Sequence, residues 1–174
     1  GIKDVINGPI AYTPDGSPLI GPAYGLKNFW INEGHSFGIT AAGGSGWQLA
    51  EWIVEGEPGI DMLGVDPRRF GAYANKHYTK AKNEEAYENV FTIHYPDEER
   101  EAARPAKTSP IHDKLDAAGA VWGQRYGWER PNWFAPAGVA RKDDWSFRRT
   151  NYFEHVGNEC RVVRDKVGII DITG

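Results

Sequence analysis

The interpretation of the fold depends on one glycine-rich stretch, Gly34-His-Ser-Phe-Gly-Ile-Thr-Ala-Ala-Gly-Gly-Ser-Gly46. It contains five of the 21 glycines in 13 residues. A β-rich run at residues 28–32 precedes it, and a helix at 45–55 is predicted after it, because Leu49, Trp52 and Ile53 share one helical face. Strand, glycine-rich turn and helix in this order leave backbone N–H groups free at a helix N-terminus, where they can bind an anion or dipole.

The spacing of these glycines does not match the common phosphate-binding loops. It is neither GxGxxG nor GxxxxGK[ST], and it has no Lys. A standard pyrophosphate or nucleoside-triphosphate site is therefore excluded. Two interpretations remain open from spacing alone: a ligand bound at the turn, or close packing of helix on strand without any ligand.

Upstream, residues 8–33 are expected to form paired strands. A first strand at 9–13 leads into the turn Pro14-Asp-Gly-Ser17, and a second at 18–20 leads into a turn at Gly21-Pro22. Downstream of the glycine-rich stretch, Gly56 is the expected C-terminal stop of the helix.

The second half of the chain is predicted to be a mixture of helices, connectors and irregular strand. The expected elements are a helix capped by Asp66-Pro67, a helix at 80–91, a polar connector at 96–110, a short helix from Ser109-Pro110 through Leu115 that ends at Gly119, an irregular strand and loop at 121–134, a helix from Asn151, and a strand at 168–173.

Composition excludes several classes of protein. The net charge of −4 argues against nucleic-acid binding, and no run of apolar residues is long enough to span a membrane. The single Cys excludes an internal disulfide framework and fits a reducing compartment. The five His residues have no metal-ligand spacing, so no metal site is expected.

Six segments together resemble the dimethylglycine and sarcosine dehydrogenase family of FAD-dependent oxidoreductases, which are D-amino-acid-oxidase-like flavoproteins. Residues 34–58 resemble the C-terminal flavin motif, and residues 7–22 resemble the strand pair before it. The segments that resemble the central domain are residues 89–100, 104–110 and 127–134, and residues 154–173 resemble the start of the aminomethyltransferase-like folate domain.

The resemblance implies an α+β fold made of parts of three domains. Residues 1–60 would be the C-terminal segment of the flavin domain, 61–118 the central linker domain, and 119–174 the start of the folate-binding domain. The chain is accordingly interpreted as a fragment of a longer protein. Alone it is expected to bind FAD poorly, because the family's dinucleotide fingerprint and flavin-linking histidine are not in it.

The resemblance also implies an activity: oxidation of the N-methyl group of dimethylglycine or sarcosine with FAD, and transfer of the one-carbon unit to tetrahydrofolate. The residues expected to contact FAD, mostly through their backbone, are Ser36, Phe37, Gly38, Ile39, Thr40 and Ala41. No catalytic residue is identified. The implied partners are a small N-methylated glycine derivative, the remainder of the full-length chain, and an electron-transferring flavoprotein as a candidate acceptor. The implied compartment is the cytoplasm in a bacterium or the mitochondrial matrix in a eukaryote.

Three side chains carry both a functional and a structural interpretation, and a fourth, Cys160, carries only a structural one. His35 would either lie near flavin or substrate, or form a hydrogen bond to the local backbone. Tyr12 and Asp15 would either approach the substrate or stabilise the turn. Cys160 is expected to be a buried structural thiol on an apolar helix face.

Two rivals to the enzyme remain. The same architecture resembles the regulatory subunit of pyruvate dehydrogenase phosphatase, which is an interaction protein. A scaffold segment without activity of its own is the third alternative.

Overall fold

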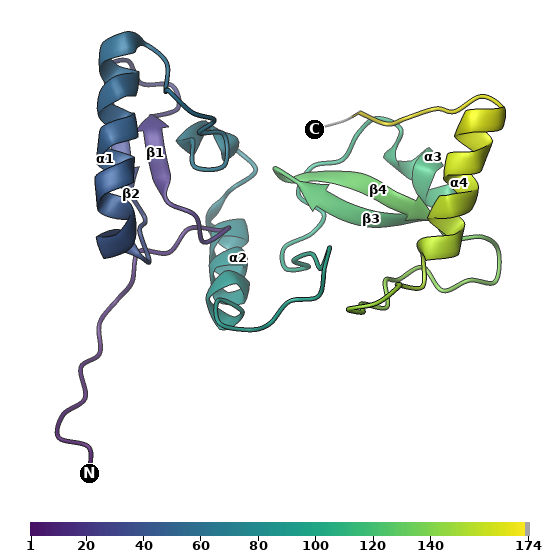
Figure 1. The fold of residues 1–174 in the computed structure, drawn as a ribbon, viewed down its shortest axis with the longest axis horizontal. Coiled ribbons are helices and arrows are strands. Elements are labelled where there is room, and N and C mark those ends of the chain that lie inside the picture. Colours follow the sequence, from purple (N-terminus) through teal and green to yellow (C-terminus); the bar gives the residue numbers. More distant parts are fainter. Residues whose placement is uncertain (173–174) are drawn as a thin grey trace. The chain divides into compact units, whose positions relative to one another are not determined.

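The computed structural model describes residues 1–172, and it divides the chain into two compact units, residues 1–90 and 91–174. Both units combine helices with a two-stranded antiparallel sheet, which agrees with the expected α+β class (Figure 1). No helix within residues 1–172 combines the length and the apolar character that crossing a bilayer requires. The two units are described separately below.

The first unit is built on the hairpin of β1 (Leu19–Pro22) and β2 (Trp30–Glu33), beside which α1 (Gly38–Glu55) lies (Figure 1). The register pairs Leu19 with Glu33 and Pro22 with Trp30. Ile20, Trp52 and Met62 form its buried core. The rings of Trp30 and Trp52 meet edge to face at 6.0 Å, which places α1 against the sheet.

Two strand predictions in this unit are wrong. Residues 9–13 form no strand; instead the Tyr12 carbonyl accepts a hydrogen bond from the Asn83 side chain, and the Thr13 hydroxyl donates to the Ser17 carbonyl. Gly21 and Pro22 belong to β1 rather than to a turn. Gly21 has a φ of +139°, and a Cβ there would lie 2.8 Å from the Trp52 ring, so the strand needs glycine to receive that ring.

The glycine-rich stretch is mostly helix, which corrects the prediction of a loop as far as Gly46. α1 begins at Gly38, so Gly43, Gly44 and Gly46 are helical despite their low helix propensity. Packing of the Trp52 face outweighs that propensity, because tertiary contacts supply most of a helix's stability. The predicted stop is confirmed: Gly56 is left-handed at φ 85°, and its N–H bonds the Trp52 carbonyl.

A buried arginine joins the N-terminal segment to the residues after α1. Arg69 ends the short 3₁₀ helix η1 (Pro67–Arg69), and its side chain is 1% exposed. Its Nε lies 2.7 Å from Asp15 Oδ2 and its Nη2 lies 2.9 Å from Asp15 Oδ1, while Nη1 and Nη2 also donate to the carbonyls of Asp66 and Ser17. Asp66 caps η1 as predicted, accepting from the Arg68 N–H, but only one turn of helix follows.

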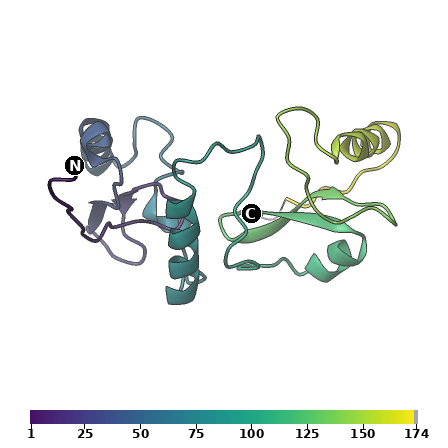
Figure 2. The ribbon, with the colours of Figure 1, turned by 90° about the horizontal axis from the view of Figure 1, so that it is seen from below.

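The helix predicted at 80–91 is α2 (Lys76–Glu88), which the Asn75 side chain caps by accepting from two backbone N–H groups. α1 is seen along its axis in Figure 2 and α2 from the side, so the two helices of this unit are not parallel. Tyr78 is buried on α2 and meets Tyr73 edge to face at 5.2 Å. Burial raises the pKa of Tyr73 to about 12, so its hydroxyl stays protonated at neutral pH.

The second unit contains a β-hairpin with a bulge where an irregular strand and loop were predicted. β3 (Ala120–Arg125) pairs antiparallel with β4 (Trp128–Phe134), with a bulge between Val121 and Trp122. Tyr126 and Gly127 join the strands with φ values of 47° and 81°, as a tight hairpin turn requires. The bulge explains the error, because it breaks the alternation that normally identifies a strand.

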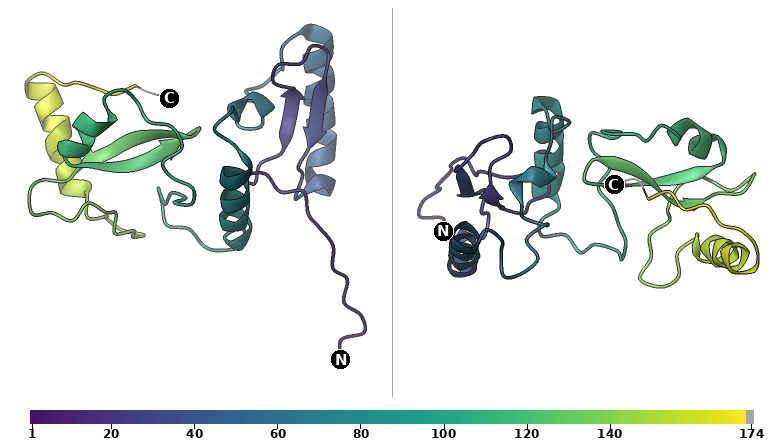
Figure 3. Two further views of the ribbon diagram at one scale, coloured as in Figure 1. Left: turned by 180° about the vertical axis from the view of Figure 1, so that it is seen from behind. Right: turned by 90° about the horizontal axis from the view of Figure 1, so that it is seen from above.

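Two helices cover this hairpin. α3 (His112–Ala117) and α4 (Phe153–Asp165) lie on opposite faces of the sheet (Figure 2, Figure 3). The buried core is Val121, Trp133 and Ala135, against which Tyr152 and Val156 pack.

Two predictions near the C-terminus are wrong for the described residues. Residues 168–172 form no strand, and Thr173, the last residue of the predicted strand, lies outside the described residues. Cys160 is exposed rather than buried, because the face of α4 that packs on the hairpin carries Val156 and not Cys160.

A pair of glycine substitutions tests the packing of α1. Gly21→Ala should lower the free energy of unfolding by about 2 kcal/mol or more, because it combines a strained positive φ with a clash against Trp52. Gly43→Ala should raise it by roughly 0.5–1 kcal/mol, because no atom lies within 4 Å of the position that a Cβ would take at this helical glycine. Urea unfolding followed by circular dichroism measures both; equal effects would contradict the assigned packing.

The buried ion pair is tested by Arg69→Lys. Lysine keeps the charge but cannot donate two hydrogen bonds to Asp15 in parallel, so unfolding should become easier by about 2 kcal/mol. Arg68→Lys is the matched control: its side chain is 51% exposed, and its pair with Asp66 should contribute less than about 1 kcal/mol. A similar loss in both variants would show that burial of Arg69 has no special role.

Candidate functional site at the start of helix α1

The turn between β2 and α1 is shaped by one obligatory glycine. Gly34 follows β2 with a φ of +74°, and a Cβ there would lie 2.8 Å from Thr13 Cγ2. A side chain at this position would both strain the backbone and displace the segment before β1. Gly34 therefore fixes the direction in which residues 35–37 lead into the helix.

The first turn of α1 presents free hydrogen-bond donors. Phe37 is the N-cap residue and supplies no side-chain acceptor. Within residues 1–172, the backbone N–H groups of Gly38, Ile39 and Thr40 have no hydrogen-bond acceptor. The Ala41 N–H, in contrast, is bonded to the Phe37 carbonyl at 3.1 Å.

The electrostatics of this turn favour negative charge. The first turn contains no acidic side chain, so nothing neutralises the positive end of the helix dipole. The Thr40 hydroxyl donates to the Phe37 carbonyl and does not cap the free N–H groups. The side chain of Ile39 is 99% exposed and leaves the approach to the turn open. The turn can therefore bind an anionic or strongly dipolar group through its backbone.

The residues predicted to contact FAD are consecutive, and they fall in two elements of the structure. Ser36 and Phe37 belong to the turn, and Gly38, Ile39, Thr40 and Ala41 form the first helical turn.

His35 is held beside this turn by one hydrogen bond. Its Nε2 lies 2.7 Å from the Asn32 side-chain oxygen, which is an acceptor, so Nε2 carries the proton. Its Nδ1 is shielded from solvent and has no partner among the described residues. The local backbone bond expected as the structural alternative for His35 is absent within those residues, because its one bond is to a side chain.

Asp15 forms an ion pair with Arg69, and the Tyr12 ring packs against a neighbouring ring. Asp15 accepts both hydrogen bonds from Arg69, and the Tyr12 ring meets Tyr87 edge to face at 5.5 Å. These contacts support the structural interpretation of both residues. Sequence reasoning missed Arg69, because Asp15 and Arg69 are 54 positions apart and no local pattern connects them.

The outer face of α1 is apolar and exposed. Ile39, Trp47 and Val54 are 99%, 66% and 76% exposed and recur at helical spacing. Gly43, Gly44 and Gly46 have no atom within 4 Å of the position a Cβ would take. Gly43, Gly44 and Gly46 are therefore not needed for packing among residues 1–172.

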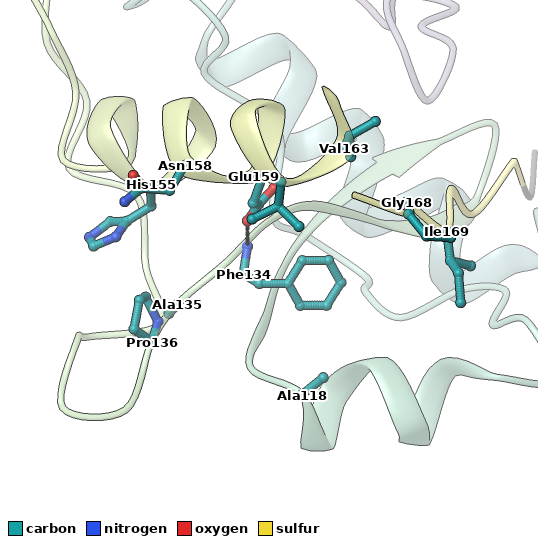
Figure 4. A pocket seen from close by; sticks show the side chains of 12 residues that line it. Ala118, Phe134, Ala135, Pro136, His155, Asn158, Glu159, Val163, Gly168 and Ile169 are labelled. Atoms are coloured by element: carbon teal, nitrogen blue, oxygen red, sulfur yellow. Dashed lines mark hydrogen bonds between the residues drawn. The ribbon is translucent and has the colours of Figure 1, made fainter. Parts of the chain in front are cut away.

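The second unit contains a cavity of about 490 Å³ between α4, the ends of α3 and β4, and residues 167–169 (Figure 4). Its walls are largely apolar, with Phe134 and Val163 among them. Its one carboxylate, Glu159, accepts a hydrogen bond from the Phe134 N–H at 2.8 Å. This carboxylate therefore already serves the sheet, and the other titratable side chain of the lining, His155, stacks on the Trp133 ring at 5.4 Å.

No metal centre is present in the part of the chain that the structure describes. Over residues 1–172, no three His, Cys, Asp or Glu side chains lie close enough together to hold an ion.

Comparison with known families divides the chain into two consecutive matches. Residues 55–109 match the family described as FAD dependent oxidoreductase central domain, and residues 111–174 match the GCVT N-terminal domain. The first match includes η1 and α2, and the second includes both strands of the β3–β4 hairpin.

Curated relatives match along almost the entire chain. Dimethylglycine dehydrogenase from Mus musculus is 42% identical over 173 residues, and human sarcosine dehydrogenase is 39% identical over 200 residues. The mouse pyruvate dehydrogenase phosphatase regulatory subunit is more distant, at 29% identity over 177 residues. In each case 99% of this chain is covered, but it spans only 20–22% of the relative.

The two domain matches occur in the order that the sequence motifs predict, and the more similar relatives are dehydrogenases of N-methylated glycines. The chain is therefore similar along almost its entire length to dimethylglycine and sarcosine dehydrogenases, and two consecutive segments of it match an FAD dependent oxidoreductase central domain and a GCVT N-terminal domain.

Proposed function

We propose that the protein containing this chain is an FAD-dependent dehydrogenase that oxidises the N-methyl group of dimethylglycine or sarcosine and passes the one-carbon unit to tetrahydrofolate. The observation that carries the proposal is the 42% identity to mouse dimethylglycine dehydrogenase over nearly the whole chain. The match of residues 111–174 to the GCVT N-terminal domain supports the folate-dependent part.

In this proposal the start of α1 is one wall of the flavin site. FAD, when bound, would accept a hydride from the substrate and gain negative charge on its pyrimidine edge. The unpaired N–H groups of Gly38, Ile39 and Thr40 would stabilise that charge, because they are fixed in place before it develops. Ser36, Phe37 and Ala41 complete the contact surface around this turn.

The residues present fit such a group. Three backbone donors converge at a helix N-terminus without a capping side chain, and no carboxylate in the first turn repels an anion. The exposed Ile39 side chain leaves space above the turn.

The proposed organisation follows from the same family relationship. Residues 1–60 would end the flavin domain, 61–118 would form the central linker domain, and 119–174 would begin the folate-binding domain. The substrate would be a small N-methylated glycine derivative, and an electron-transferring flavoprotein is the candidate electron acceptor. The protein would act in the mitochondrial matrix of a eukaryote or in the cytoplasm of a bacterium; the names of the mammalian dimethylglycine dehydrogenases describe those proteins as mitochondrial.

A non-enzymatic regulatory subunit is the second candidate, because the phosphatase regulatory subunit matches over the same span. The lower identity of 29% to that protein favours the dehydrogenase.

The activity is tested on the full-length protein. We expect bound flavin after purification and oxidation of dimethylglycine or sarcosine, measured with an artificial electron acceptor. Tetrahydrofolate should lower the formaldehyde released per turnover, because it captures the one-carbon unit. Absence of flavin together with absence of turnover would favour the regulatory subunit.

The flavin contact is tested by replacing Gly38 in the full-length protein. Gly38→Pro removes one free N–H at the first helical position, where proline is tolerated, and should weaken FAD binding by about tenfold or more. Gly38→Ala retains the N–H and is the matched control; its Cβ would lie 3.4 Å from His35 Cβ, an acceptable contact. FAD affinity is measured by fluorescence titration of the apoprotein. Equal affinity in the two variants would show that this N–H does not contribute to FAD binding.

A further inference from the structure

A continuous set of contacts connects the buried Arg69 to the turn that leads into α1. Arg69 lies in the segment that matches the oxidoreductase central domain, whereas the turn at residues 34–37 precedes that segment. Both belong to the unit of residues 1–90. The contacts therefore join two parts of the chain, only one of which lies in the family match.

The first contact in this set holds a tight turn at residues 13–17. The Arg69 guanidinium donates to both carboxylate oxygens of Asp15, at 2.7 and 2.9 Å, and to the Ser17 carbonyl at 2.9 Å. A bidentate pair of this kind fixes the orientation of the carboxylate as well as its distance. Because the Arg69 side chain is buried, water does not compete for these bonds.

The second contact is made by the buried Thr13 side chain, which shares its acceptors with Arg69. The Thr13 hydroxyl lies 2.6 Å from the Ser17 carbonyl oxygen and 3.1 Å from Asp15 Oδ1. Arg69 Nη2 donates to the same two oxygens. The position of the Thr13 side chain is therefore set by the groups that Arg69 holds.

The third contact is between the Thr13 methyl group and Gly34. A Cβ on Gly34 would lie 2.8 Å from Thr13 Cγ2, so the backbone of residue 34 lies directly against this methyl group. The three residues after Gly34 lead to the N–H groups of Gly38, Ile39 and Thr40 at the start of α1. A shift of Thr13 would therefore change the direction in which these N–H groups point.

We propose that Arg69 is a positioning residue for the flavin-binding turn. It acts through Asp15 and Thr13, and it fixes the direction in which the N–H groups at the start of α1 meet FAD. This inference rests on the proposed flavin site. Donors that are fixed in advance stabilise developing charge best, so disorder in the turn should weaken the binding of reduced FAD more than that of oxidised FAD.

The reduction potential of FAD in the full-length protein tests the proposal. Arg69→Lys keeps the charge but loses the bidentate geometry, so the affinity for reduced relative to oxidised FAD should fall about tenfold, which lowers the potential by about 30 mV. Thr13→Ser keeps the hydroxyl but removes the methyl group that contacts Gly34, and a fall of about threefold, or about 15 mV, is expected. Equilibration with a reference dye measures the potential of each variant.

Ala86→Gly is the control for a general loss of stability. Ala86 is buried on α2 in the same unit, and it takes no part in the contacts described above. Glycine there should make unfolding easier without moving the turn, so the potential should equal that of the wild-type protein. An equal fall in potential in Ala86→Gly would show that Arg69 acts only through the stability of the unit, and it would overturn the proposal.

Hydrogen exchange in the full-length protein stripped of FAD gives a readout that does not need the cofactor. The Ala41 N–H, which is bonded to the Phe37 carbonyl, reports on the order of the first turn of α1. Its exchange should be about tenfold faster in Arg69→Lys, because a mobile turn allows the start of the helix to open locally. The Gly56 N–H, bonded to the Trp52 carbonyl at the other end of α1, should exchange at the wild-type rate.

The outcomes separate this inference from the proposed function. Absence of FAD from the purified wild-type protein would contradict the proposed flavin site, and this inference with it. A wild-type reduction potential in FAD-containing Arg69→Lys and Thr13→Ser would refute the positioning role of Arg69 alone and leave the flavin site intact.

Discussion

A two-stranded hairpin cannot bury enough apolar surface to be stable alone, and this constraint governs both units of the chain. Each unit meets it by packing one tryptophan between its hairpin and a helix. In the first unit Trp52 fills the space above Gly21, and in the second Trp133 is 1% exposed and bonds Asp143 through its indole N–H. The rest of each unit is arranged around that ring.

The first unit also depends on the buried positive charge of Arg69, whose partner Asp15 is far away in the sequence. Arg69 brings its guanidinium into the protein, where an unpaired charge would be very costly. Asp15 and two carbonyls satisfy it, so the segment before β1 is held against η1 without forming a strand. The same segment supplies Thr13, against which Gly34 packs, and thereby positions the turn before α1.

In this arrangement some hydrogen-bond donors remain unpaired and some apolar side chains remain exposed. The first turn of α1 keeps three N–H groups unpaired, and the outer face of the helix keeps Ile39, Trp47 and Val54 exposed. The pocket around Trp133 is lined by three carboxylates, those of Asp97, Glu99 and Asp143. The first feature agrees with the flavin site proposed from the family relationship, whereas the second and third were not visible in the sequence. The acidic residues at 97 and 99 appear in a charged run that looks like solvated surface until the fold places Asp143 beside them.

The sequence by itself determined the strand-turn-helix order around Gly34, the stop at Gly56 and the α+β class, because these depend on motifs and on local backbone preferences. It did not determine where α1 begins, since helix propensity opposes Gly43, Gly44 and Gly46 and only packing of Trp52 makes them helical. It missed the β3–β4 hairpin, because a bulge at Val121 and Trp122 disrupts the alternation of side chains. The pairing of Arg69 with Asp15, and the meeting of Asp97, Glu99 and Asp143, were decided by tertiary structure alone, because each joins residues tens of positions apart that share no local pattern.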